Sequence, residues 1–201
     1  EIMPSLVGSE MCIRDRIEEL SKKLNCHPVI ANLLLQRGIT SSEQAQSFFY
    51  PSLNMLHDPF LMKDMDKAVE RLDRAIAQDE KILIYGDYDV DGTTAVSLLY
   101  KYLKHHCNSD NLEYYIPDRY TEGYGVSIKG IDYAAENGFS LMLITDCGIK
   151  AVEKVKYANS RQVDIIICDH HTPGDTLPEA IAVLDPQRPD CPYPYLSLIH
   201  I

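Results

Sequence analysis

The sequence contains no tryptophan and only four phenylalanines, and no apolar run approaches the ~20 residues that a membrane span needs. Its six cysteines are scattered, without a Cys-x-x-Cys pair. This spacing argues against a thiolate zinc site and against a disulfide framework, and it suits a reducing compartment. The first residues lack the charged and then apolar pattern of a signal peptide. We therefore expect a cytoplasmic globular protein that has no membrane partner.

Positive charge is also scarce. Lysine and arginine total 19 against 30 aspartates and glutamates, which gives a formal net charge of −11. A chain this acidic attracts nucleic acid poorly. If the substrate is nucleic acid, metal ions must offset the local charge, or a basic surface must lie outside this chain. The 201 residues, 45% of them hydrophobic, suffice for one medium domain or for one domain and a smaller piece.

The two ends of the chain read differently from the rest. Residues 1–16 show no helix or strand period and resemble translated read-through of a sequencing adapter, and residues 197–201 resemble another such product. We expect both to be non-native tails, and the chain to be a fragment of a longer protein. The alternative is that they are ordinary termini.

Residues 17–78 carry helical periodicity and capping residues, which predict a small helical N-terminal segment. Gly38 is expected to end one helix, and Thr40 to Glu43 offer an N-cap and a capping box for the next. The predicted helices lie near residues 17–24 and 29–37, from the cap at 40–43 through residue 49, and at 66–78.

From residue 79 the pattern alternates between short apolar runs and amphipathic stretches. This alternation predicts an α/β domain over residues 79–196, with a mainly parallel sheet flanked by helices. The expected strands are 81–85, 112–116, 141–145, 163–168 and 180–184. The expected helices between them are 93–105, 127–137 and 150–158.

Three aspartates, Asp87, Asp89 and Asp91, follow the first of these strands. Residues two apart on an extended chain point the same way, so the three carboxylates would share one face if the chain stayed extended. Clustered carboxylates repel one another unless a cation neutralises them, and Mg²⁺ or Mn²⁺ would do so. The alternative is an acidic turn on the surface.

Two further strands end in residues of the same kind. Asp146 follows the third predicted strand, and Asp169, His170 and His171 follow the fourth. Ligands of open parallel sheets bind at the carboxyl ends of the strands, so these side chains should meet at one edge. Such a set predicts a two-metal site for phosphoryl hydrolysis, with oxygen-rich ligands that suit Mn²⁺ or Mg²⁺ better than Zn²⁺.

The motifs Asp-Tyr-Asp-Val-Asp-Gly, Thr-Asp-Cys-Gly and Asp-His-His, in this order, resemble those of the DHH phosphoesterase superfamily. Further segments across residues 17–196 resemble its bacterial single-stranded-DNA-specific exonucleases. The resemblance implies 5′-to-3′ degradation of single-stranded DNA to nucleotides, with two Mn²⁺ or Mg²⁺ ions, in DNA recombination and repair.

The resemblance also implies roles for individual residues. Asp89 and Asp91 match metal ligands, and Asp87 matches a ligand or its close support. Asp146 matches a carboxylate that bridges the two ions, and His170 matches a further ligand.

Four more residues receive roles from the resemblance. His171 would approach the scissile phosphate, and Asp169 would orient one imidazole. Arg119 would contact phosphate, with a salt bridge to a carboxylate as the alternative. Tyr124 would stack on a base, with simple packing of the loop as the alternative.

The family's fourth motif, which carries another aspartate ligand, would lie beyond the end of this sequence, as would its second catalytic domain and its oligonucleotide-binding domain. We therefore expect this chain alone to bind metal weakly and to show little or no nuclease activity. One alternative is another phosphoesterase of the superfamily, acting on pyrophosphate, short oligonucleotides or cyclic dinucleotides, although those have a different first motif. The second is a non-catalytic scaffold relative in DNA replication or repair.

Overall fold

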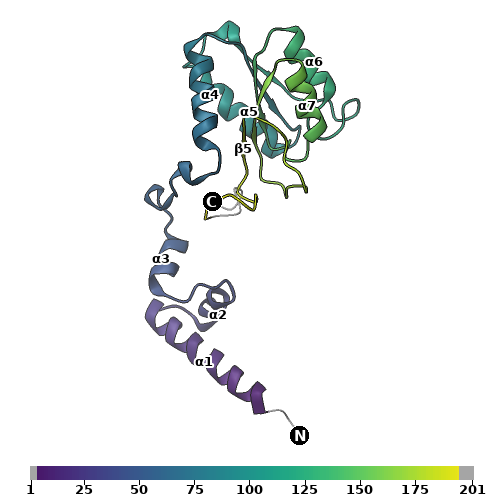
Figure 1. The fold of residues 1–201 in the computed structure, drawn as a ribbon. Helices are drawn as coiled ribbons and strands as arrows, with labels where there is room; N and C mark the ends of the chain where they lie inside the picture. The colour runs from purple at the N-terminus through teal and green to yellow at the C-terminus, as the bar shows by residue number, and fades with distance from the viewer. Residues whose placement is uncertain (1–3, 195–201) are drawn as a thin grey trace. The chain divides into compact units, whose positions relative to one another are not determined.

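The computed structural model describes residues 4–194, which form two compact units divided between Leu56 and His57. The first unit is helical, and the second holds the sheet and its flanking helices (Figure 1). Among the described helices, none combines the length and the apolar character needed to cross a bilayer. The expected tail at residues 197–201 lies outside the described residues.

The first unit has a small core of its own. Its members come from different helices: Leu20, Ala31, Leu34 and Ala45 are all nearly inaccessible to solvent. A capping box is present, but one residue later than the predicted Thr40–Glu43 pair: the Ser41 side chain accepts from the Gln44 backbone, while the Gln44 side chain accepts from the Ser41 backbone. The elements are α1 (Pro4–Leu24), α2 (Pro28–Gln36), α3 (Ser42–Phe49) and η1 (Leu53–Met55).

Helix α1 extends into the segment in which we found no helical period. It begins at Pro4, and a proline is tolerated in the first turn because the amide hydrogen it lacks would have no helical partner there. A helix therefore covers most of residues 1–16, although their sequence shows no helical period. That this segment is non-native stays a prediction.

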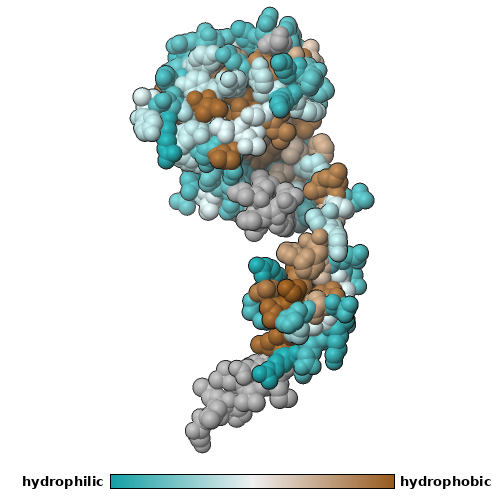
Figure 2. All heavy atoms as spheres, turned by 180° about the vertical axis from the view of Figure 1, so that it is seen from behind, coloured by the Kyte–Doolittle hydropathy of each residue, from teal (hydrophilic) through white to brown (hydrophobic). Residues whose placement is uncertain are grey.

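Large apolar side chains gather on the surface of the first unit, where brown atoms are prominent in Figure 2. The sequence predicted apolar positions in α2, yet three of them are substantially exposed and only Leu34 is fully buried. The exposed apolar residues of α2 and α3 are Val29, Ile30, Leu33, Phe48 and Phe49. A concentration of this kind is typical of a surface that packs against other protein.

The second unit is built on a five-stranded sheet with the strand order β2-β1-β3-β4-β5. All four strand pairings are parallel, as the sequence predicted. The strands are β1 (Ile82–Gly86), β2 (Leu112–Tyr115), β3 (Leu141–Thr145), β4 (Asp164–Cys168) and β5 (Ala182–Leu184). The helical elements are η2 (Pro59–Leu61), α4 (Met65–Ala77), α5 (Val90–Leu103), η3 (Ser109–Asn111), α6 (Ile128–Glu136) and α7 (Val152–Ser160).

Alternate residues of each central strand face opposite sides of the sheet, and both sides are buried. On one side, Leu83 and Met142 belong to a core shared with residues of α6 and α7. On the other side, Ile82 and Leu143 belong to a core shared with residues of α4 and α5. Helices therefore cover both faces (Figure 1), which explains why β1 and β3 are apolar at nearly every position.

Helix α4 belongs with the sheet and not with the preceding helices, so the structure divides the chain earlier than the predicted boundary at residue 78. Ala68 and Ala75 of α4 are buried in the sheet core. Arg71, on the same face, is also buried and pairs with Glu80 at 2.7 Å and with Asp164 at 2.6 Å. These two ion pairs join α4 to the residue before β1 and to the start of β4.

Candidate metal centre

The carboxyl ends of β1, β3 and β4 carry the side chains that the sequence singled out. The connection after β1 leads to β2 on one side, whereas the connection after β3 leads to β4 on the other side. A crevice is expected at such a switch point, because the two crossovers diverge. The candidate centre therefore lies where this fold class places its ligands.

The loop after β1 does not stay extended, so the condition under which the three carboxylates would share one face is not met. Helix α5 begins at Val90 and not near Thr93, because the carboxylate of Asp89 caps it by accepting from the amides of Asp91 and Gly92, each at 3.0 Å. Asp91 therefore lies in the first helical turn and is exposed. The capping bond from Gly92 lowers the pKa of Asp89.

Gly92 has no side chain where the chain packs most tightly. A Cβ atom at this position would lie 2.4 Å from the carbonyl oxygen of Asp87. The absence of that atom lets the first turn of α5 close over the backbone of Asp87. Asp87 itself is 1% exposed, and burial raises its pKa, with the charge of Asp89 acting in the same direction.

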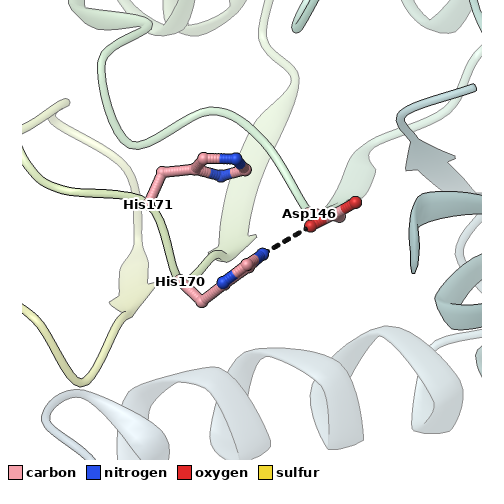
Figure 3. A group of neighbouring side chains, drawn as sticks. All are labelled: Asp146, His170 and His171. Carbon is pink, nitrogen blue, oxygen red and sulfur yellow. Dashed lines mark hydrogen bonds and ion pairs between the residues drawn. The ribbon is translucent and has the colours of Figure 1, made fainter. Parts of the chain in front are cut away.

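Asp146 follows β3 and is 8% exposed, with a left-handed backbone (φ +59°) that is uncommon for residues other than glycine. Its Oδ1 lies 2.9 Å from Nε2 of His170 (Figure 3). Burial and contact with the carboxyl of Asp89 raise the pKa of Asp146 to about 6. Side chains delivered by β1, β3 and β4 therefore meet in one place.

The Asp169-His170-His171 segment is organised by its aspartate. Asp169 is 2% exposed; its Oδ2 accepts from the amide of Ile149 at 2.9 Å, and its Oδ1 accepts from the amide of His170 at 2.7 Å. The same Oδ1 lies 2.7 Å from Nδ1 of His171. Burial would lower the pKa of His171, but the hydrogen bond and charge of Asp169 outweigh it and raise that pKa overall.

The loop between β2 and α6 brings Tyr124 to the centre and leaves Arg119 beside it. The Tyr124 hydroxyl lies 3.2 Å from Nε2 of His171, and burial raises the pKa of this tyrosine. The Arg119 guanidinium lies 5.1 Å from the centre of the Tyr88 ring. It forms no ion pair with any carboxylate that the structure describes, so the alternative of a salt bridge is not observed.

Glu122 holds this loop in place. Its side chain is 5% exposed and accepts from the Ser127 hydroxyl at 2.6 Å, the Tyr115 hydroxyl at 2.9 Å and the Asp118 amide at 3.0 Å. Burial alone would raise the pKa of Glu122, but these hydrogen bonds lower it overall. The hydrogen bonds of the buried Glu122 side chain therefore hold the loop that carries Tyr124 in one conformation.

Asp185, which follows β5, is a residue that the sequence analysis did not assign to the site. It is fully buried, and its pKa is raised to about 6, chiefly by burial and further by the charge of Asp169. The available signal was the repetition of one pattern, an aspartate directly after an apolar strand.

A cavity of about 660 Å³ opens beside Asp146 and His170. Asp91 also lines it, whereas most of its wall is apolar and comes from the segment before α4, from α5 and from the strand ends. The apolar lining residues are Pro59, Met62, Met65, Leu98, Leu99, Leu184 and Tyr193. The centre is thus accessible to a ligand from this side.

The donor set fits a divalent cation. Single ligand atoms of Asp146, His170 and His171 all lie within 4.8 Å of one another. Among the described residues, Oδ1 of Asp87 is one of two buried side-chain oxygens without a hydrogen-bond partner. Buried carboxylates at close range are unfavourable without a compensating charge, and carboxylate oxygens with imidazole suit Mn²⁺ or Mg²⁺.

The domain has a parallel α/β sheet, and the ends of its central strands carry acidic and imidazole groups. Such groups are the metal ligands of a divalent-metal hydrolase, which is the class of protein that the fold and the site indicate. The chain belongs to the DHH family, since the model of the "DHH family, N-terminal domain" matches residues 81–198.

Relatives and solved structures agree with this assignment. The chain is 41% identical over 185 residues to the single-stranded-DNA-specific exonuclease RecJ of Bacillus subtilis (strain 168), and 33% identical over 171 residues to that of Escherichia coli (strain K12). These matches cover 92% and 85% of this chain, but only 23% and 29% of the relatives' length. The crystal structure of RecJ with Mn²⁺ from Thermus thermophilus matches with a TM-score of 0.68 and 26% identity, over 88% of this chain and 24% of that one.

A second solved structure, of exonuclease RecJ bound to manganese, matches with a TM-score of 0.60 and 32% identity. The match covers 67% of this chain and 34% of that one. The predicted fold is confirmed by these likenesses, and manganese is the ion named for both solved relatives.

Proposed function

We propose that this chain is part of a metal-dependent exonuclease that hydrolyses single-stranded DNA from the 5′ end, acting in the cytoplasm in recombination and repair. The observation that carries the proposal is the meeting of Asp89, Asp146 and His170, which come from the ends of three different strands. The similarity to RecJ proteins supplies the substrate class, and the orphaned carboxylate oxygen of Asp87 supports a bound cation.

Asp89, Asp91, Asp146 and His170 would hold the ions, with Asp87 as a ligand or its support. Two divalent ions at such a centre supply a nucleophilic water near neutral pH and charge stabilisation for a phosphodiester. Among these residues, Asp146 is central, because its carboxyl contacts both Asp89 and His170.

His171 would bind the scissile phosphate. In its neutral form, Nδ1–H donates to Asp169 and Nε2 accepts from the Tyr124 hydroxyl, so both neighbours fix the ring. The raised pKa favours the protonated form, which would place a positive charge beside developing negative charge. Arg119 would add a contact to phosphate, and Tyr124 an aromatic surface for a base.

The proposal is tested with a gene product that contains this sequence and spans the length of its relatives. We expect that longer protein, with Mn²⁺, to release nucleotides from 5′-labelled single-stranded DNA, and its Asp146→Ala variant to lose this activity by at least about 100-fold. The exposed Asp175→Ala change is the matched control and should leave the activity unchanged. An Asp146→Ala variant as active as the wild type would refute the proposal.

The 201-residue chain alone is expected to show little or no turnover, since it spans 23% of the Bacillus relative. Turnover of labelled single-stranded DNA by this chain comparable to that of the longer protein would contradict this expectation. A parallel panel of pyrophosphate, short oligonucleotides and cyclic dinucleotides separates the exonuclease from other phosphoesterases.

A further inference from the structure

Asp185 presents a buried hydrogen-bond acceptor without a donor. The side chain is 0% exposed, and its Oδ1 accepts from the amide of Gln187 at 2.7 Å. Its Oδ2 has no hydrogen-bond partner among the described residues. Unsatisfied buried carboxylate oxygens are unfavourable, so one that persists needs an explanation.

His170 has a ring nitrogen without a hydrogen-bond partner in residues 4–194. Its Nε2 lies 2.9 Å from Asp146, while no hydrogen bond to its Nδ1 occurs within the described part of the chain. A histidine that binds a metal through one ring nitrogen almost always donates the other N–H to a carboxylate, a carbonyl or a water. Binding through Nε2 would therefore leave an N–H at Nδ1 that requires an acceptor.

The two residues belong to adjacent segments. Strands β4 and β5 pair in the register Cys168 to Leu184, and the amide of Asp169 donates to the carbonyl of Leu184 at 2.9 Å. The side chain of Gln187 donates to the carbonyl of His170. The segment after β5 thus already supports the backbone that carries the His170 ring.

Strand spacing argues against direct ligation by Asp185. Neighbouring strands lie about 4.8 Å apart, so β5 lies roughly 10 Å from β3 and farther still from β1. Asp146 and Asp89, which would hold an ion, follow β3 and β1, and β4, which carries the His170 segment, lies between β3 and β5. Asp185 can therefore act on the ion only through His170.

We propose that Asp185 is a positioning residue, whose Oδ2 accepts the Nδ1–H of His170 when Nε2 of that ring binds a divalent ion. The inference rests on the proposed function, because it requires a metal at Nε2. It assigns the buried carboxylate the task of fixing the tautomer and the orientation of the ring.

The test uses the 201-residue chain and two readouts that need no nuclease activity. Free Mn²⁺ is measured by electron paramagnetic resonance during titration, and the Nδ1–H signal of His170 is followed by ¹⁵N NMR with diamagnetic Mg²⁺. We expect Asp185→Ala to weaken Mn²⁺ binding by about 10- to 100-fold and to remove the protected Nδ1–H signal. Asp185→Asn, with a neutral and weaker acceptor, should lie between wild type and Asp185→Ala in both readouts.

Asp175→Ala removes an exposed carboxylate from the neighbouring loop and controls for the loss of one negative charge. Equal Mn²⁺ affinity of the wild type and Asp185→Ala would overturn the positioning role and leave the proposed function intact. Weaker binding with an unchanged Nδ1–H signal would show a merely structural role and would also overturn it. A wild-type chain that binds no Mn²⁺ at millimolar concentration would overturn the positioning role, while the nuclease assay of the longer protein decides the proposed function separately. If Asp185→Ala fails to fold, Asp185→Asn decides.

Discussion

The phenolic hydroxyl of Tyr124 lies 3.2 Å from Nε2 of His171, while Nδ1 of the same ring lies 2.7 Å from Oδ1 of Asp169. Two loops that are far apart in sequence thus hold one imidazole from both sides. The ring of Tyr124 also meets that of His171 edge to face, with centroids 6.1 Å apart. The orientation of His171 is therefore set before any substrate arrives.

This arrangement predicts that Asp169→Asn lowers the pKa of His171. Burial already acts to lower that pKa, and the hydrogen bond and charge of Asp169 are the main causes that raise it. Tyr124→Phe removes only the hydroxyl, so it should leave the pKa of His171 above its ordinary value. Titration of the His171 ring signals by NMR measures both variants. A pKa of His171 that is unchanged in Asp169→Asn would contradict this account.

Asp146 should make the metal-free protein less stable at neutral pH. Its pKa is raised from 3.8 to about 6, so its contribution to stability is fully present below pH 3.8 and is lost as the pH rises through about 6. We expect Asp146→Asn to raise the free energy of unfolding at pH 7 by roughly 1–2 kcal/mol, because water screens part of the effect.

Denaturant unfolding at pH 4 and pH 7 tests this expectation. The gain in Asp146→Asn should appear at pH 7 and vanish at pH 4, and Mn²⁺ should stabilise the wild type but not the variant. A variant that is less stable than the wild type at pH 7 without metal would show that Asp146 chiefly supports the fold.

Gly92→Ala should disrupt the centre through the backbone alone. The added methyl group would lie 2.4 Å from the carbonyl oxygen of Asp87, so the first turn of α5 must move. We expect a loss of roughly 1–3 kcal/mol in the free energy of unfolding and weaker Mn²⁺ binding. Gly174→Ala, whose nearest neighbour would be 3.9 Å away, is the matched control and should change neither. Equal stability of the two variants would refute the close packing described for Gly92.

Glu122 should stabilise the loop only above its own pKa. That pKa is lowered from 4.5, so the contribution is fully present above pH 4.5 and is lost as the pH falls through the value in the folded state. Glu122→Gln should lower the free energy of unfolding by about 1–3 kcal/mol at pH 7.

The difference between Glu122→Gln and the wild type should shrink as the pH falls below 4, which chemical denaturation at several pH values would show. Glu136→Gln, at an exposed position of α6, serves as the control. A difference that stays constant down to pH 3 would mean that the charge of Glu122 is not responsible.

The strands could be predicted closely because each is a short apolar run between breakers. β3 begins and ends at the predicted residues, and β2 and β4 differ by one residue at one end. β1 is shifted by one residue at both ends, and β5 begins two residues later than predicted. The parallel sheet follows from the same pattern. Hydrophobic periodicity reports burial directly, so elements buried on both faces are the easiest to recognise.

Features that depend on tertiary contacts were missed. Nothing local marks Arg71 as buried, because its partners Glu80 and Asp164 lie elsewhere in the sequence. The start of α5 was placed too late, since the capping role of Asp89 competed with an extended reading of the same residues. Asp185 lies near the His170 segment because β5 pairs with β4. The order of strands in a sheet cannot be predicted from the local sequence of one strand.

The backbone of Asp146 has a further consequence for how such a gene would decay. An aspartate at φ +59° occupies a conformation that glycine adopts at lower energy, and its carboxyl contacts that of Asp89. Random replacement by glycine would therefore relieve backbone strain and remove a buried acid, so the metal-free protein would gain stability while losing this carboxylate. Where metal binding is no longer selected, this codon is expected to change early.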